Sequence, residues 1–78
     1  MIKSSRRGGE NVENNFKITL KAARVNKGFS QIEASNALGV SVVTLRSWEK
    51  GATFPNVEQI KKIEDIYSVE YKDIIFLH

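Results

Sequence analysis

The sequence predicts an all-α fold, in which residues 16–78 form one compact domain of five short helices and residues 1–15 form a polar arm. Apolar residues recur at the three- and four-residue spacing of an amphipathic helix. Helix-capping side chains precede these segments, and glycine follows most of them. No part of residues 16–78 predicts a convincing strand. A chain of 78 residues has the length of one small domain, which buries about 60% of its unfolded surface.

The N-terminal arm, residues 1–15, is expected to be disordered because it is polar and has no apolar periodicity. Its basic residues are Lys3, Arg6 and Arg7. They leave two interpretations open. The arm could follow a phosphate backbone or enter a minor groove, as the arms of some DNA-binding domains do. The interpretation that we favour is a solvated tail or a cloning remnant.

The first two helices are predicted from their ends. The first begins at Phe16, and Gly28 supplies a left-handed cap at its C-terminus. The second begins after Ser30, whose side chain forms a capping box with that of Glu33. It runs to Gly39, so the two helices are short and closely connected.

The third helix is predicted from a staple and a cap. Ser41 can accept hydrogen bonds from the free amides of the first turn. Val40, before the cap, and Leu45, inside the helix, form a hydrophobic staple. Gly51 ends the helix.

Two more helices complete the predicted domain. The fourth begins at Asn56, directly after Pro55. Its apolar positions recur at helical spacing and are Val57, Ile60, Ile63 and Ile66. The fifth is a short helix over residues 70–77. The side chains that it offers to the core are Tyr71, Ile74, Ile75 and Leu77.

The composition argues against catalysis and metal binding. The chain has no cysteine, and its one histidine is His78, so thiolate sites and a catalytic triad are missing. No glycine-rich phosphate loop precedes a helix. A bilayer-spanning run of about 20 apolar residues and a signal peptide are also missing. We expect a cytoplasmic protein that is not an enzyme and needs no cofactor, metal or small-molecule ligand.

Positive charge is concentrated in the first part of the domain. The net charge is +3 and the pI is about 9.4. Residues 16–51 carry six basic and two acidic side chains, whereas residues 52–78 carry three basic and five acidic ones. The first part is therefore the one suited to a polyanionic partner.

Residues 30–56, SQIEASNALGVSVVTLRSWEKGATFPN, place two capped helices on either side of Gly39, as in a helix-turn-helix. The run strongly resembles the Xre or Cro/C1-type (lambda repressor-like) family of bacterial and phage transcriptional regulators. The matching positions are Gln31, Gly39, Val40, Ser41, Leu45, Trp48, Glu49 and Gly51. The resemblance implies a sequence-specific regulator of double-stranded DNA, of phage or prophage type and acting as a repressor, found at the nucleoid and able to form a homodimer.

The outward face of the third helix can be worked out from its geometry. At 100° per residue, Leu45 and Trp48 lie together and must face the core. The opposite side, called here the outward face, carries Val42, Val43, Arg46, Ser47 and Lys50. Resemblance to the family implies that these positions read bases. The two valines cannot form hydrogen bonds but can contact thymine methyl groups, which predicts a T-containing half-site.

Several polar candidates have two interpretations each. Arg46 could donate to a guanine edge or bind phosphate. Lys50 could bind phosphate or only interact with the dipole at the helix C-terminus. Thr44 could pack against the core or reach a phosphate. Ser41 is a cap first, and Ser47 can only discriminate weakly between bases.

The resemblance implies two further roles. Gln31, at the N-terminus of the second helix, should hold a phosphate together with the free helix amides. Arg24 and Glu49 should form a structural salt bridge that holds the third helix against the first.

The sequence departs from the family pattern at three places. Ala34-Ser35 replaces a large apolar residue followed by alanine. Ser68 stands where glycine is common, and Glu70 where a serine cap is common.

A second function class stays open. The same fold could serve as a protein-interaction module, antitoxin-like or regulator-binding, with Val42 and Val43 as its contacts. A homodimer could use the segment DIIFLH, residues 73–78. There, Ile74 and Leu77 are expected in the core, which leaves Ile75 or Phe76 for the contact.

Overall fold

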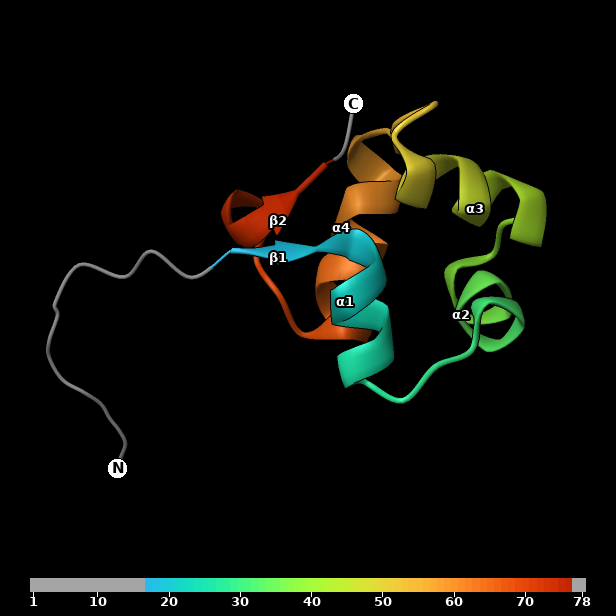
Figure 1. Cartoon of the computed structure of the whole chain (residues 1–78), viewed down its shortest axis with the longest axis horizontal. Helices are drawn as coiled ribbons and strands as arrows, with labels where there is room; N and C mark the ends of the chain where they lie inside the picture. The colour runs from blue at the N-terminus through green and yellow to red at the C-terminus, as the bar shows by residue number, and fades with distance from the viewer. Residues whose placement is uncertain (1–16, 77–78) are drawn as a thin grey trace, which may run out of the picture.

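Residues 17–76 are described by a computed structural model, in which four α-helices surround one core and a short parallel strand pair joins the two ends of this segment (Figure 1). The elements in chain order are β1 (Ile18–Thr19), α1 (Leu20–Asn26), α2 (Gln31–Leu38), α3 (Val42–Lys50), α4 (Val57–Tyr67), a 3-10 turn (Tyr71–Asp73) and β2 (Ile74–Ile75). The predicted arm, Phe16, Leu77 and His78 lie outside the described residues. The all-α helix-turn-helix fold is confirmed, but the count of five helices is wrong.

The first correction concerns the start of the first helix. α1 begins at Leu20 rather than Phe16, because Thr19 is extended and its hydroxyl accepts from the amide of Ala22 at 3.1 Å. The two residues before α1 pair with β2 in parallel, with Ile18 opposite Ile74 and Thr19 opposite Ile75. The expectation that residues 16–78 contain no strand is therefore wrong.

The second correction concerns the predicted fifth helix. Residues 71–73 make only a 3-10 turn, and residues 74–75 are extended in β2. Glu70 provides no side-chain hydrogen bond to cap a helix at this point. The backbone that follows the turn pairs with β1, which ends any helical continuation.

The predicted caps are confirmed by the hydrogen bonds at the helix ends. Ser30 and Glu33 form the capping box of α2, and Ser41 accepts from the amide of Thr44 at the start of α3. The fourth helix was predicted to begin at Asn56, but α4 begins one residue later, at Val57, because Asn56 is its N-cap and forms a second box with Gln59. Three glycines end or follow helices with positive φ, as side chains rarely allow. They are Gly28 at +83°, Gly39 at +75° and Gly51 at +82°.

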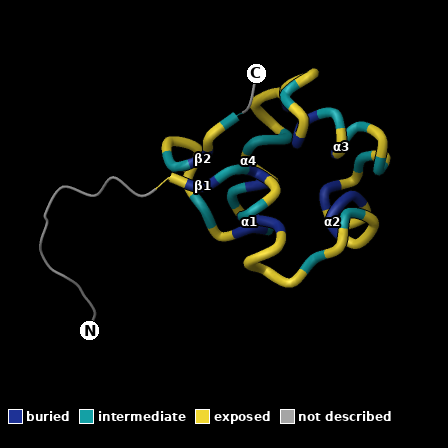
Figure 2. Tube along the Cα trace, viewed as in Figure 1, coloured by how far each residue is buried: buried dark blue, intermediate teal, exposed yellow. Residues whose placement is uncertain are grey.

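The core lies where the helices face one another (Figure 2). Its side chains are buried and come from every element except the 3-10 turn. They are Ile18, Leu20, Ala23, Ala34, Leu38, Leu45, Trp48, Ile63, Tyr67 and Ile74. The small pair Ala34-Ser35 is also buried, and the Ser35 hydroxyl donates to the carbonyl of Ile32 at 2.9 Å. This bond satisfies the side chain of Ser35, the one polar residue of α2 that is fully buried.

Ser68 ends α4 in the left-handed conformation, with φ 56° and ψ 47°. A side chain there is strained by about 1 to 2 kcal/mol, whereas the hydrogen bond that its hydroxyl accepts from Lys27 is exposed. Ser68→Gly removes this strain, but part of the gain is lost because glycine increases the conformational entropy of the unfolded chain. The net increase in the free energy of unfolding should be about 0.5 to 1 kcal/mol. Urea denaturation measures this gain. Ser68→Ala is the control, since it removes the hydroxyl but keeps the strain, and equal stability of the two variants would contradict the prediction.

Candidate nucleic-acid interface

α3 has one face in the core and one in solvent. Leu45 is fully buried and Trp48 is 3% exposed, so both lie inward as predicted. On the outward face, Val43 is 68% exposed, Arg46 and Lys50 are exposed, and Val42 and Ser47 are half-buried. The helix therefore presents an apolar N-terminal end and a basic C-terminal end on one side.

The N-terminus of α3 is held by two hydroxyls. Ser41 accepts from the amide of Thr44 at 3.1 Å and donates to the Thr44 hydroxyl at 3.0 Å. Ser41 is thus a cap, as expected. Thr44 is half-buried, and its own hydroxyl proton is still able to bond a ligand.

The C-terminal half of α3 is joined to the loop that follows it. The Thr53 hydroxyl donates to the hydroxyl of Ser47 at 2.8 Å. Lys50 has no hydrogen-bond or ion-pair partner among residues 17–76. All the ammonium donors of Lys50 are therefore available to an anion, and Ser47, which only accepts from Thr53, keeps its hydroxyl proton.

A buried ion pair fixes α3 to α1. Arg24 Nε donates to Glu49 Oε2 at 2.7 Å and Arg24 Nη2 to Oε1 at 3.3 Å. The side chains are 7% and 5% exposed. Arg24 Nη1 also donates to the carbonyl of Phe29, in the connection before α2, at 2.9 Å. Arg24 and Glu49 therefore form the pair that the family resemblance implied, and it ties three segments together.

Gln31 connects this buried pair to the outward face. Its Nε2 donates to Glu49 Oε1 at 3.1 Å, and its Oε1 accepts from Arg46 Nε at 3.0 Å. Gln31 is the first residue of α2, as predicted, and is half-buried. These two contacts could not be predicted from the sequence, because they depend on how α2 crosses α3. Gln31 is 15 residues from Arg46 and 18 residues from Glu49, and these separations predict no contact until the crossing of the two helices is known.

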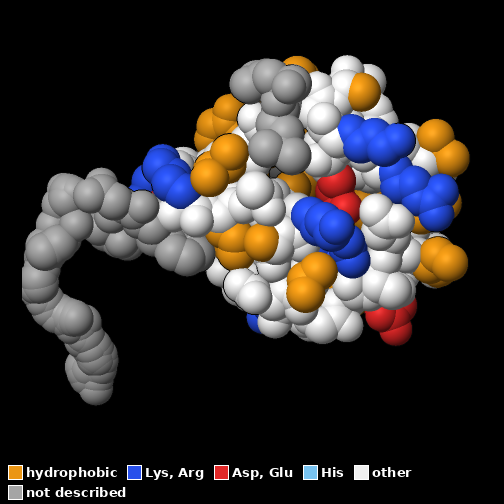
Figure 3. Space-filling view, in the orientation of Figure 1, with side chains coloured by type: hydrophobic (Ala, Val, Ile, Leu, Met, Phe, Trp, Pro, Cys, Tyr) orange, Lys and Arg blue, Asp and Glu red, His pale blue; other side chains and the backbone are white. Residues whose placement is uncertain are grey.

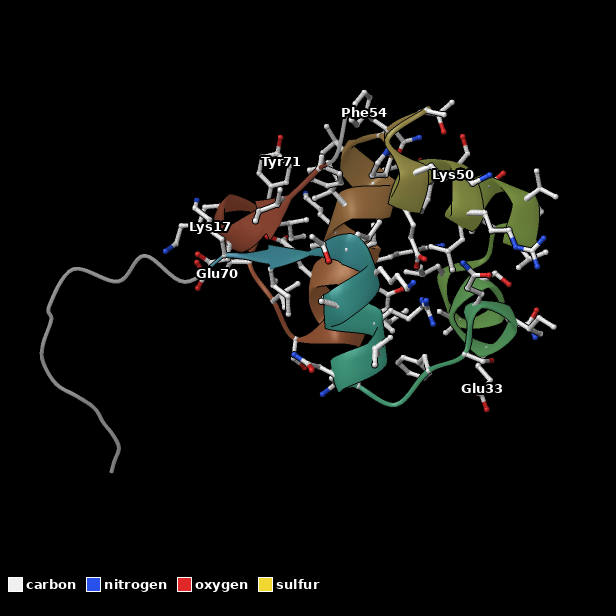
Figure 4. All side chains as sticks on the ribbon, in the orientation of Figure 1. Lys17, Glu33, Lys50, Phe54, Glu70 and Tyr71 are labelled. Carbon is white, nitrogen blue, oxygen red and sulfur yellow. The ribbon has the colours of Figure 1, made fainter. Side chains whose placement is uncertain are left out.

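Basic and apolar side chains lie beside one another where α2 and α3 reach the surface (Figure 3). Lys50 stands on the outer side of α3, whereas Glu33 projects from α2 away from α3 (Figure 4). Glu49, the one acidic residue of α3, is buried against Arg24. The exposed side of α3 is therefore free of negative charge, which suits a polyanion.

Tyr67, at the end of α4, is a buried tyrosine whose pKa is shifted by its burial and by the charges of Arg24 and Glu49. It is 1% exposed, and its hydroxyl has no hydrogen-bond partner among the described residues. Burial raises the pKa of Tyr67 from 10.0 to about 12. The negative charge of Glu49 adds a smaller increase, and the positive charge of Arg24 lowers the pKa in part. The folded state therefore holds this proton more tightly than the unfolded state does.

This pKa predicts a loss of stability in alkali. The contribution of Tyr67 is complete below pH 10 and should be lost as the pH rises from 10 to 12, by about 2 kcal/mol. Tyr67→Phe should remove this loss, and it should gain about 1 kcal/mol at pH 7 by deleting an unpaired buried hydroxyl. Urea denaturation between pH 7 and 12 tests both effects. Tyr71→Phe, at a side chain that is 53% exposed, is the control, and a variant of Tyr67 that follows the wild-type curve would contradict the prediction.

Two absences hold within residues 17–76. None of the helices there has the length and hydrophobicity to span a bilayer. No cluster of three or more histidine, cysteine, aspartate or glutamate side chains in this segment could hold a metal ion.

Comparison with known proteins agrees with this geometry. A family model described as helix-turn-helix matches residues 20–74. A cryptic phage CTXphi transcriptional repressor, RstR of Vibrio cholerae, is 28% identical over 60 residues, which are 77% of this chain and 54% of that protein. The chain thus spans about half the length of this curated relative. No solved structure gives a significant match.

Proposed function

The chain belongs to the Cro/C1-type helix-turn-helix family, and from this premise we propose that it is a sequence-specific transcriptional repressor that reads the major groove of its operator with α3. Membership supports the coarser statement, a DNA-binding transcriptional regulator. The observation that carries the finer one is the outward face of α3. It reaches solvent and has no acidic group, and the opposite side of the helix is buried at Leu45, Trp48 and Glu49.

Each residue of the outward face has a proposed role. Val42 and Val43 stand at the N-terminal end of α3, the part of a recognition helix that contacts base edges, and would contact thymine methyl groups. Arg46 would supply the polar reading beside them. Lys50 would bind phosphate with its free ammonium group. Ser47 would add at most a weak preference, because a hydroxyl can both donate and accept and so discriminates weakly between bases.

Three residues at helix starts would position the domain on the phosphate backbone. Gln31 lies at the N-terminus of α2, where free amides favour an anion. Ser41 and Thr44 lie at the N-terminus of α3, and Thr44 retains a proton to donate. Such contacts fix register and carry no sequence information.

The experiment that tests sequence-specific binding is selection of bound duplexes from a random DNA pool. We expect a T-containing motif, and Val43→Ala should weaken the preference for T at one position or more without unfolding the domain. Recovery of no motif would reject sequence-specific reading. A motif that Val43→Ala leaves unchanged would reject the role of the valines alone.

A protein-interaction module is the second candidate, and exposed apolar side chains favour it. Ile32 on α2 is 63% exposed and Val43 on α3 is 68% exposed. Salt distinguishes the two functions. Operator binding should weaken steeply, with log K falling by about 0.9 per phosphate neutralised for each unit of log salt. An apolar protein contact should not show this slope, so a flat salt series from 50 to 200 mM would favour the second candidate.

The proposal has three further parts. The protein would repress transcription, form a homodimer through its exposed apolar side chains, and lie in the cytoplasm at the nucleoid. The relative from Vibrio cholerae carries the description of a transcriptional repressor. A shallow apolar groove of about 380 Å³ is lined by Phe54, Pro55, Ile60, Tyr71 and Phe76, and Phe54 and Tyr71 lie at the same edge of the molecule (Figure 4). Ile74 is in the core, whereas Ile75, the next residue of β2, is 41% exposed. Sedimentation at rising concentration tests the dimer, and an unchanging monomer mass would reject it.

A further inference from the structure

A chain of hydrogen bonds leads from the core to the outward face of α3. Arg24 donates to Glu49 at 2.7 Å, Gln31 donates to Glu49 at 3.1 Å, and Arg46 donates to Gln31 at 3.0 Å. Arg24 and Glu49 are buried, whereas Arg46, at the other end of this series of hydrogen bonds, is exposed. Gln31 is thus the connection between a structural ion pair and a residue that faces solvent.

The chemistry of the two neighbours fixes the orientation of the Gln31 amide. A carboxylate only accepts hydrogen bonds, so Nε2 must face Glu49. A guanidinium only donates, so Oε1 must face Arg46. Glutamine can bridge an anion and a cation in this way. Glutamate at position 31 would instead place a second carboxylate beside Glu49.

This contact leaves one end of Arg46 available. Its Nε is bonded to Gln31, and its two terminal nitrogens have no hydrogen-bond acceptor among residues 17–76. Those nitrogens form the fork that can donate two parallel bonds to the N7 and O6 of guanine. An exposed arginine without the contact would sample many rotamers and would lose that freedom on binding.

We propose that Gln31 is a positioning residue for Arg46, and that the buried pair Arg24 and Glu49 holds Gln31 in place. Gln31 would act on base preference through Arg46, because both ends of its side-chain amide are already bonded. A phosphate at the start of α2 would be held by the free backbone amides there, which Gln31→Met leaves in place. The inference rests on the proposed function, because it assigns Arg46 to a base. It also states how sequence reading is coupled to the core of the domain.

A double-mutant cycle on the selected operator tests the proposal. Gln31→Met keeps side-chain length and Arg46→Met keeps the length of the aliphatic stem, and both remove the polar groups. Arg46→Met should weaken binding about tenfold, and Gln31→Met about threefold. The double variant should bind about as weakly as Arg46→Met alone, because the effect of Gln31 passes through Arg46. Lys50→Met is the matched control, and its effect should multiply with that of Gln31→Met.

Two further readouts separate positioning from a general loss of structure. Gln31→Met should flatten base preference at the operator position that Arg46→Met flattens, and leave the other positions unchanged. In the free protein, the Nε proton resonance of Arg46 should be protected from exchange in the wild type and lose that protection in Gln31→Met.

The possible results are distinct. Multiplying effects of Gln31→Met and Arg46→Met, or an Nε resonance that Gln31→Met does not change, would overturn the inference and leave the proposed function intact. An Arg46→Met variant that weakens all sequences equally would assign Arg46 to phosphate and overturn the inference too. Recovery of no motif from the random pool would reject the proposed function, and the inference with it.

Discussion

Glu49→Ala should cost about 3 to 5 kcal/mol of the free energy of unfolding, because it leaves the guanidinium of Arg24 buried without its anion. Arg24 is 6% exposed, and its remaining described partner is the carbonyl of Phe29. Small domains lose about 4 to 8 °C of melting temperature per kcal/mol. Thermal denaturation should therefore show a fall of more than ten degrees, and an unchanged melting temperature would contradict the prediction.

The control for Glu49→Ala is a variant that removes both charges. Arg24→Met with Glu49→Met should be more stable than Glu49→Ala, since no unpaired charge stays in the core. In DNA binding, Glu49→Ala should leave base preference largely unchanged at the operator positions that the two valines read. Its main effect should be on the free energy of unfolding. A double variant as unstable as the single one would show that packing, rather than the buried charge, causes the loss.

Leu45→Ala should cost about 3 to 5 kcal/mol, because Leu45 is fully buried between α3 and the rest of the core. A domain of this size has a total stability of only about 5 to 15 kcal/mol. The variant should therefore unfold in much less urea than the wild type. Equilibrium urea denaturation followed by the fluorescence of Trp48, on the same helix, measures the shift.

Val43→Ala is the matched control for Leu45→Ala, two residues away on the same helix. Val43 is 68% exposed, so its truncation should change stability by less than about 0.5 kcal/mol. Its effect should appear in the preference for thymine. A loss of stability at Val43 as large as that at Leu45 would mean that the outward face is packed.

Local signals explain why most of the helices could be predicted. The capping box of Ser30 and Glu33 and the cap at Ser41 act within four residues, so the sequence alone reveals them. The strand pair could not be found in this way. Ile18 and Ile74 lie far apart in the chain, and strands of two residues leave no alternation to detect.

The inward and outward faces of α3 also followed from helical geometry, since burial at Leu45 and Trp48 fixes the opposite side. The pair of Arg24 with Glu49 came from the resemblance to a family. The contacts of Gln31 came from neither source. They depend on the angle at which α2 meets α3 and on the rotamers of three polar side chains, which no local pattern records.

The parallel pairing of β1 with β2 gives the domain a mechanical property. Because the strands run in the same direction and stand at opposite ends of the described chain, tension applied at residues 17 and 76 would act along the strands. The bonds of the pair would then be loaded together in shear rather than opened one after another. The four helices would bear little of the applied force until the two strands separated.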